Sequence, residues 1–132
     1  MLSIELKTDV KIYYHKTNEL VNIIKDKCDL IITMNITRSL AKRLIDKNKT
    51  KLYFVSCSRD LEDLSKERYY LGCSHLKLYR TNDKVFISTA NLSLSSWDEL
   101  TIELNRNYEL DNFIKEIENK LKLKHTFYKE FW

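Results

Sequence analysis

Strand-like and helix-like spacings of apolar residues alternate along the first half of the chain, and this alternation restricts the fold more than any other feature of the sequence. Apolar side chains recur every second residue over 10–14, as in a strand, and every third or fourth residue over 20–28, as in a helix. The same succession follows downstream, with strand-like segments at 29–34 and 51–56 and a helix-like segment at 36–45 between them. The sequence therefore predicts an α/β fold.

The second half of the chain begins with helical spacing and then changes to strands. A third helix is predicted over 60–70, with Ser58 as its N-cap and Gly72, the single glycine, as a left-handed residue after its end. Asn82 and Asp83 separate two strand-like segments and form the predicted turn of a hairpin. The remaining predicted elements are strands over 75–80, 84–89 and 100–104 and a C-terminal helix over 110–121.

Length and composition agree with one soluble domain. The chain has 132 residues, of which 43% are hydrophobic, and this is enough for one core and too little for two. We expect a single domain over 1–132, an α/β sandwich in which helices flank a mixed central β-sheet. No apolar run approaches the roughly 18 residues of a membrane-spanning helix, and Glu5, Lys7 and Asp9 stand where a secretory signal is apolar. A cytoplasmic protein that does not use a membrane is therefore expected.

Cysteine usage and net charge narrow the choice of ligands. The three cysteines, Cys28, Cys57 and Cys73, lack the CxxC pairing of zinc sites and are odd in number, so neither a metal site nor a disulfide framework is indicated. The formal net charge of +4 suits an anionic partner, although it is weaker than the charge bias of a dedicated nucleic-acid clamp.

His75 and Lys77 are the first residues of the sequence to suggest a chemical reaction. Residues two apart on a strand point the same way, so an imidazole and an ammonium group are presented side by side. Thr89 and Asn91 are also two apart, beyond the Asn82–Asp83 turn, where a paired strand brings a hydroxyl and an amide to the histidine. These four groups suit a phosphodiester, since a nucleophile, a cation and neutral donors are all supplied. By itself, H-x-K also occurs by chance on solvated strands.

The segment HLKLYRTNDKVFISTANLS resembles the signature of the phospholipase D superfamily, H-x-K-x4-D-x6-G-S-x-N. The resemblance extends over the flanking helix–strand pattern, from about residue 10 to residue 118. Three departures are present. The aspartate position of the signature falls on Asn82, with Asp83 one place later, and the whole interval is one residue shorter than the common pattern. The glycine–serine pair reads Ser88–Thr89.

The resemblance implies a metal-independent phosphodiesterase without a cofactor. His75 would attack phosphorus to give a phosphohistidine, with Lys77 and Asn91 completing the catalytic set and Ser88 and Thr89 binding the substrate. Glu103 occupies the place of the acid that orients the histidine. Family members need two such motifs and this chain has one, so the resemblance implies a homodimer that brings two His75 side chains to one phosphate.

The expected substrate is nucleic acid, because small single-motif members of this superfamily resemble nucleases. Trp97 and Arg106, together with Arg80 and Lys84, are candidates to line a phosphate-tracking groove. Trp97 is equally typical of a core or an interface, and the aromatic C-terminal end is predicted to pack on the domain or on a second subunit.

Three other interpretations remain open at this point. In the first, the chain is a catalytically degenerate relative that only binds nucleic acid. In the second, it is an active phosphodiesterase whose substrate is a phospholipid or another small diester. The third is a metal-dependent nuclease, since Glu5-Leu6-Lys7 has the E-x-K spacing of the restriction-type fold, but that fold also needs an upstream acidic residue and only four residues precede Glu5.

Overall fold

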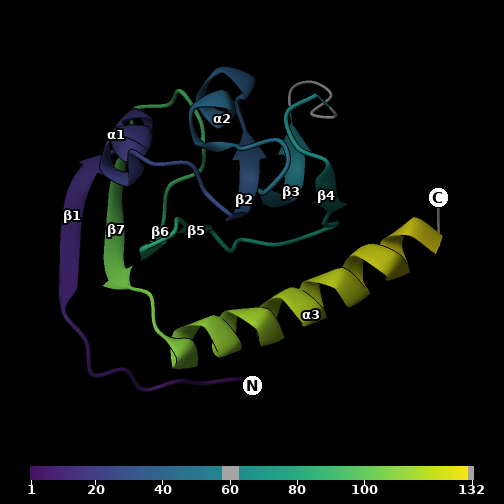
Figure 1. Cartoon of the computed structure of the whole chain (residues 1–132). Coiled ribbons are helices and arrows are strands. Elements are labelled where there is room, and N and C mark those ends of the chain that lie inside the picture. The colour runs from purple at the N-terminus through teal and green to yellow at the C-terminus, as the bar shows by residue number, and fades with distance from the viewer. Residues whose placement is uncertain (58–62, 131–132) are drawn as a thin grey trace.

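The computed structural model of the chain describes residues 1–57 and 63–130. Within these ranges the chain forms seven strands, three α-helices and one short 3₁₀ helix (Figure 1). The strands are β1 (Val10–Lys16), β2 (Leu30–Ile36), β3 (Lys51–Cys57), β4 (Glu67–Tyr70), β5 (Leu78–Arg80), β6 (Lys84–Ser88) and β7 (Asp98–Asn105). The helices are η1 (Thr17–Glu19), α1 (Leu20–Ile24), α2 (Arg38–Leu44) and α3 (Tyr108–Glu130).

All seven strands belong to one mixed sheet with the order β1-β7-β6-β5-β2-β3-β4. The strands β2, β3 and β4 run parallel to one another, and the pairs that connect β2 through β5, β6 and β7 to β1 are antiparallel. The predicted α/β fold with a mixed sheet is therefore confirmed.

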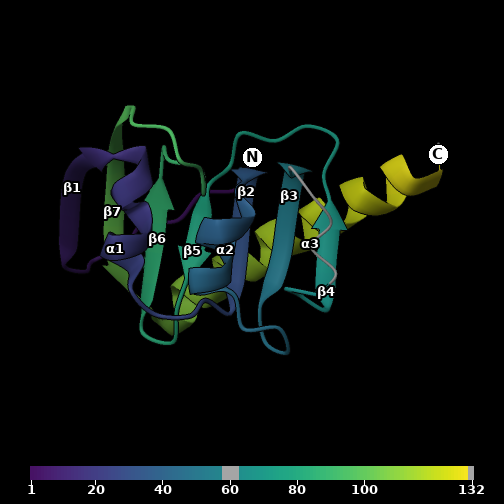
Figure 2. The same ribbon diagram turned by 90° about the horizontal axis from the view of Figure 1, so that it is seen from above.

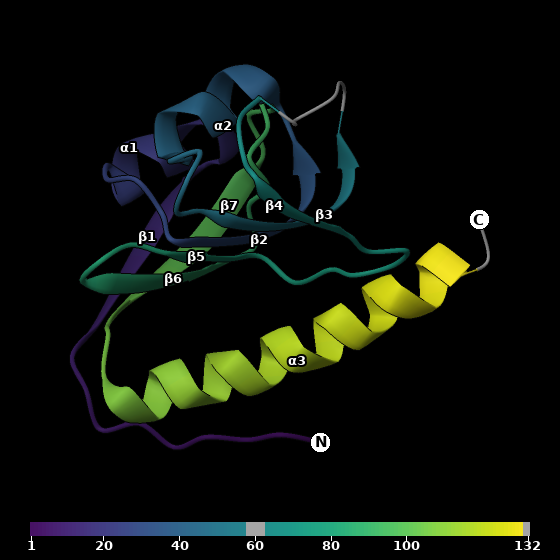
Figure 3. The same ribbon diagram turned by 45° about the vertical axis from the view of Figure 1, so that its right-hand side comes forward.

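Helices cover both faces of the sheet. Figure 2 shows α1 and α2 in front of the strands and α3 behind them, and Figure 3 shows the same arrangement from another side. Neighbouring residues of a strand point to opposite faces, so β2, β3, β5 and β6 contribute side chains to a core cluster on each side of the sheet. Ile31 of β2 and its partners Leu52 and Tyr79 belong to the core cluster under α1 and α2. Ile32 and its partner Tyr53 belong to the cluster that packs against α3.

The prediction of a third helix over 60–70 is wrong for all of its described residues, because 63–66 are not helical and Glu67–Tyr70 form strand β4 beside β3. The ring of Tyr69 stacks on Tyr53 with centroids 4.7 Å apart, and Tyr70 meets Phe54 edge-on at 6.0 Å. These cross-strand ring contacts outweigh the helical spacing. Ser58 and residues 60–62 lie outside the described residues. Gly72 follows a strand and does not have a positive φ, so the predicted left-handed helix cap is also wrong.

The predicted hairpin turn at Asn82 and Asp83 is confirmed. The N–H of Thr81 donates to the carbonyl of Lys84 at 2.9 Å, and the hydroxyl of Thr81 accepts from the N–H of Lys84 at 3.1 Å. The strand before this turn begins at Leu78, three residues later than predicted. None of the described helices is both long and apolar enough to cross a membrane.

Candidate functional site

The segments that carry the predicted catalytic residues meet at one end of the sheet, which we call the site end. Here β2, β3 and β4 terminate, the segment 71–77 leads from β4 to β5, and the loop 89–97 leads from β6 to β7. Backbone hydrogen bonds join these segments, from Ser88 N to Lys77 O at 3.1 Å and from Thr37 N to Leu92 O at 2.7 Å. The carboxyl ends of parallel strands are where α/β folds usually place their ligands.

His75 and Lys77 lie in the segment that enters β5. The carbonyl of Lys77 continues the pairing with β6, so alternation places its side chain on the same face of the sheet as Tyr79, the face of α1 and α2. Leu76 packs on the opposite side, in the α3 cluster. His75 is exposed and Lys77 is partly buried. Within the described residues, neither side chain makes a hydrogen bond or an ion pair. An imidazole and an ammonium group are thus available at the site end.

Asn91 binds the end of β2 through its side-chain carbonyl. Its Oδ1 accepts hydrogen bonds from the N–H groups of Met34 and Asn35, both at 3.1 Å, and from the hydroxyl of Thr33 at 3.2 Å. The pairing of β2 with β5 ends at Ile32, one residue before Thr33. Beyond that point the side chain of Asn91, and not β5, accepts hydrogen bonds from β2. If this register is continued, Thr33 lies level with Lys77 and Asn35 with His75. Asn91 therefore belongs to the same end of the sheet as the H-x-K pair.

A buried tyrosine holds the loop that carries Asn91. The hydroxyl of Tyr79 donates to the carbonyl of Ala90 at 2.8 Å and lies 3.1 Å from the hydroxyl of Thr33. Burial raises the pKa of Tyr79 far above its usual range, so the phenol stays a neutral donor. The sequence offered one signal for this contact, which is that Tyr79 shares a strand face with Lys77.

Ser88 points into the protein, where its hydroxyl belongs to a chain that ends at a buried histidine. Ser88 Oγ lies 2.7 Å from Thr101 Oγ1, which lies 2.6 Å from His15 Nε2. The other ring nitrogen of His15 is 2.7 Å from the carbonyl of Lys16, so in the neutral ring that nitrogen donates and Nε2 accepts. Ser88 Oγ also accepts from the N–H of Ala90 at 2.9 Å. The Ser88 hydroxyl is therefore engaged within the fold.

Thr89 is the exposed member of the predicted substrate cradle. Its hydroxyl accepts from the N–H of Leu100 at 3.0 Å and donates to Glu99 at 3.1 Å. Glu99 is thus the carboxylate that β7 contributes near the site end. The sequence could not distinguish it from Glu103, because the two residues are four apart and face the same side of one strand.

Glu103 is not brought to His75. Its carboxylate accepts a hydrogen bond from the hydroxyl of Tyr13 at 2.9 Å and lies 3.9 Å from the ammonium group of Lys84. It lies about 13 Å farther along β7 than Glu99, at 3.3 Å per residue, away from the site end. The structure ties Glu103 to β1 and β6, the strands on either side of β7.

Arg106 lies at the opposite end of the sheet from His75. Its guanidinium donates two hydrogen bonds to Asp111 at 3.1 Å each, and single bonds to Asp29 and to the carbonyl of Thr81 at 3.0 Å each. It therefore fixes the start of α3 to the hairpin turn. Trp97 is at the site end and is exposed, and its carbonyl accepts from the N–H of Thr17 at 3.0 Å.

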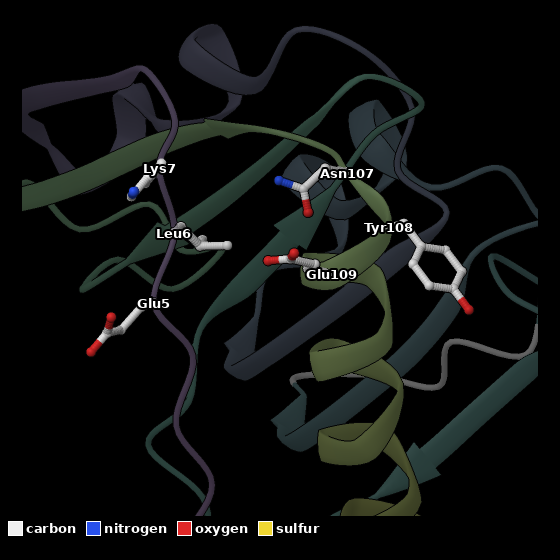
Figure 4. A pocket seen from close by; sticks show the side chains of 6 residues that line it. All are labelled: Glu5, Leu6, Lys7, Asn107, Tyr108 and Glu109. Atoms are coloured by element: carbon white, nitrogen blue, oxygen red, sulfur yellow. The ribbon is translucent and has the colours of Figure 1, made fainter.

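A cavity of about 650 Å³ lies apart from these residues, between the N-terminal segment and the start of α3. Figure 4 shows Leu6 and Glu109 pointing into it, whereas Tyr108 points away. Glu5 and Lys7, the pair with E-x-K spacing, also line it. Over residues 1–57 and 63–130, no three His, Cys, Asp or Glu side chains form a cluster suited to a metal ion.

Comparisons with protein-family models, with curated proteins and with solved structures find no match for this chain. The chemistry of the site end is therefore argued from its own residues. It combines an unpaired imidazole, an unpaired ammonium group and the amide of Asn91, whose nitrogen makes no hydrogen bond in the described part of the chain. Such a set can supply a nucleophile and can stabilise negative charge on phosphate oxygens.

Proposed function

We propose that the chain is a metal-independent phosphodiesterase of the phospholipase D type that hydrolyses nucleic acid. The observation that carries the proposal is that His75 and Lys77, unpaired in the described chain, lie at the same end of the sheet as Asn91. A buried imidazole with fixed partners, such as that of His15, has a structural explanation, whereas the side chain of His75 has none. The mixed sheet covered by helices on both faces supports the finer assignment to a phospholipase D-like sandwich.

In the proposed mechanism, His75 attacks phosphorus and forms a P–N bond while the P–O bond to the leaving group breaks. Lys77 and the amide N–H of Asn91 stabilise the charge on the non-bridging oxygens. A second histidine gives its proton to the leaving oxygen and then takes one from the water that cleaves the phosphohistidine. One chain has one such motif, so the second histidine is His75 of another copy in a homodimer.

The orienting carboxylate has two candidates. The sequence resemblance assigns it to Glu103, which in this structure is held by Tyr13 and lies near Lys84. Glu99 lies nearer to the site end, where Thr89 donates to it. We propose Glu99 for this role, because it lies at the site end, whereas Glu103 lies farther along β7 and contacts Tyr13 and Lys84.

Nucleic acid is the proposed substrate because the net charge is +4 and because Trp97 is exposed at the site end, where a base can stack on it. A phospholipid or another small diester is the alternative substrate.

Cleavage of single-stranded and double-stranded DNA and of RNA in excess EDTA tests the proposal. We expect activity in the chelator, a loss of at least about 10³-fold for His75→Ala and about 10²-fold for Lys77→Met. Lys49→Met is the matched control, because Lys49 is an exposed lysine at the other end of the sheet.

Activity that disappears in EDTA, or that is equal in the wild type and His75→Ala, would refute the histidine mechanism. Retarded migration of DNA without cleavage would instead indicate a binding protein. Hydrolysis of phospholipid vesicles without cleavage of nucleic acid would keep the mechanism and change the substrate.

A further inference from the structure

An apolar face of the sheet is exposed where β1, β7 and β6 lie side by side. We call it the uncovered face, and five large hydrophobic side chains on it are between 39% and 73% exposed. They are Val10, Ile12, Tyr14, Ile87 and Leu100. Ile102, which is paired with both Ile12 and Ile87, completes the face and is partly buried.

The uncovered face follows from the geometry of the sheet. These residues lie on the α3 side, since Ile12 and Ile102 are in register and Ile102 packs against the α3 cluster. Figure 2 shows that α3 runs behind β5, β2, β3 and β4, so β1 and most of β7 have no helix on this side. A shallow depression of about 290 Å³ lies between Ile12, Ile87 and Leu100 and extends to Ser88 and Thr89.

The area of the uncovered face matches what a dimer requires. The exposed parts of its side chains amount to roughly 500 Å², at the upper end of the largest apolar patches of monomers. A standard interface buries about 800 Å² on each partner, a little more than half of it apolar, which is about 450 Å². One uncovered face therefore provides the apolar part of one side of a standard interface.

The charges at the rim favour a second copy over other partners. Lys16 and Asp98, the last residue of β1 and the first of β7, form an ion pair with each other. A two-fold interface places a surface against itself, so unbalanced charge would repel. This surface is internally balanced, whereas a nucleic-acid or lipid-headgroup surface needs unpaired cations.

We propose that two copies of the chain associate through the uncovered face in a two-fold interface. The uncovered face lies on the α3 side of the sheet, whereas the alternation of side chains places Lys77 on the side of α1 and α2. This interface therefore does not by itself bring two His75 side chains together. It is independent of the proposed function and rests on exposure, area and charge.

The test is the mass of the full chain in solution, by light scattering or sedimentation, for the wild type, Ile12→Lys and Leu100→Lys. We expect a dimer for the wild type at micromolar concentration. For both variants the dissociation constant of the dimer should rise at least about 100-fold, so that they are monomers under the same conditions. Leu123→Lys is the matched control, because Leu123 on α3 is 72% exposed and lies outside this face. Circular dichroism and the melting temperature check that each variant folds.

A wild-type monomer, or a dimer that persists in both folded variants, would overturn the assignment. Should both variants fail to fold, cross-linking of Ile12→Cys copies across the two-fold axis decides, since absence of the cross-linked dimer contradicts the interface. His75→Ala separates this proposal from the enzymatic one. A dimer that never cleaves DNA refutes the function and leaves the interface standing, whereas a monomer that cleaves DNA refutes both the interface and the site shared by two copies.

Discussion

Replacement of Asn91 separates its structural contribution from the catalytic role proposed for it. The side-chain oxygen accepts three hydrogen bonds, from Met34 N, Asn35 N and Thr33 Oγ1, and the amide nitrogen is left for the substrate. Asn91→Ala removes both groups. Asn91→Asp keeps an acceptor for β2 and removes the N–H donor.

The loss of stability in Asn91→Ala follows from the environment of each donor. The N–H of Asn35 is exposed, so water replaces its partner at little cost. The N–H of Met34 and the hydroxyl of Thr33 are partly buried and contribute about 1 kcal/mol each. The free energy of unfolding should therefore fall by about 2 kcal/mol, and the melting temperature by about 8 °C for a domain of this size.

Urea denaturation and thermal melting measure these values, and DNA cleavage in EDTA is measured on the same samples below the melting temperature. Asn91→Asp should melt within about 2 °C of the wild type and still lose about 10²-fold in cleavage rate, because its carboxylate holds β2 and repels phosphate. Two results would refute the reasoning. One is an unchanged melting temperature in Asn91→Ala, and the other is an equal loss of stability in both variants.

Two further predictions concern the opposite end of the sheet and the buried tyrosine. Arg106→Met should lower the free energy of unfolding by about 2 kcal/mol in urea denaturation, because Asp29 and Asp111 lose the guanidinium of Arg106 and keep the ion pairs with Arg80, while the cleavage rate stays unchanged; a selective loss of cleavage would restore the substrate-binding role predicted from the sequence. Burial raises the pKa of Tyr79 above its ordinary value of 10.0, so its contribution to stability is complete below about pH 10 and is lost as the pH rises further. The urea midpoint of the wild type should fall in that range and that of Tyr79→Phe should fall less steeply, whereas equal slopes would contradict the assignment.

Most secondary structure could be predicted from the sequence, because periodicity reports which side of an element is buried. The strands β1, β2, β3, β6 and β7 and the helices α2 and α3 overlap their predicted ranges. Strand β4 could not be predicted, since Leu64, Glu67 and Tyr70 have the spacing of a helix and only the rings of Tyr53 and Phe54 on β3 make the strand favourable. Local propensity is easily overridden by such contacts.

The candidate site could also be predicted only in part. The sequence predicts that residues on the two strands of the Asn82–Asp83 hairpin lie together, and the hairpin does align Lys77 with Ser88. Glu103 and Arg106 depend on the register of β7 against β6, which no local pattern determines. The pairing of Ser88 with Thr101 fixes which residues of β7 reach the site end.

The pairing of β1 with β7 also has a consequence for how the protein is made. The two strands meet across a sequence separation of 90 residues, as between Tyr13 and Glu103, and β1 has no other partner strand. A chain leaving the ribosome exposes β1 first and cannot pair it until β7 has been synthesised, and such distant pairings close slowly. Until then the alternating apolar residues of β1 belong to an unpaired, exposed and aggregation-prone strand. We therefore expect the newly made chain to depend on chaperones more than its small size suggests.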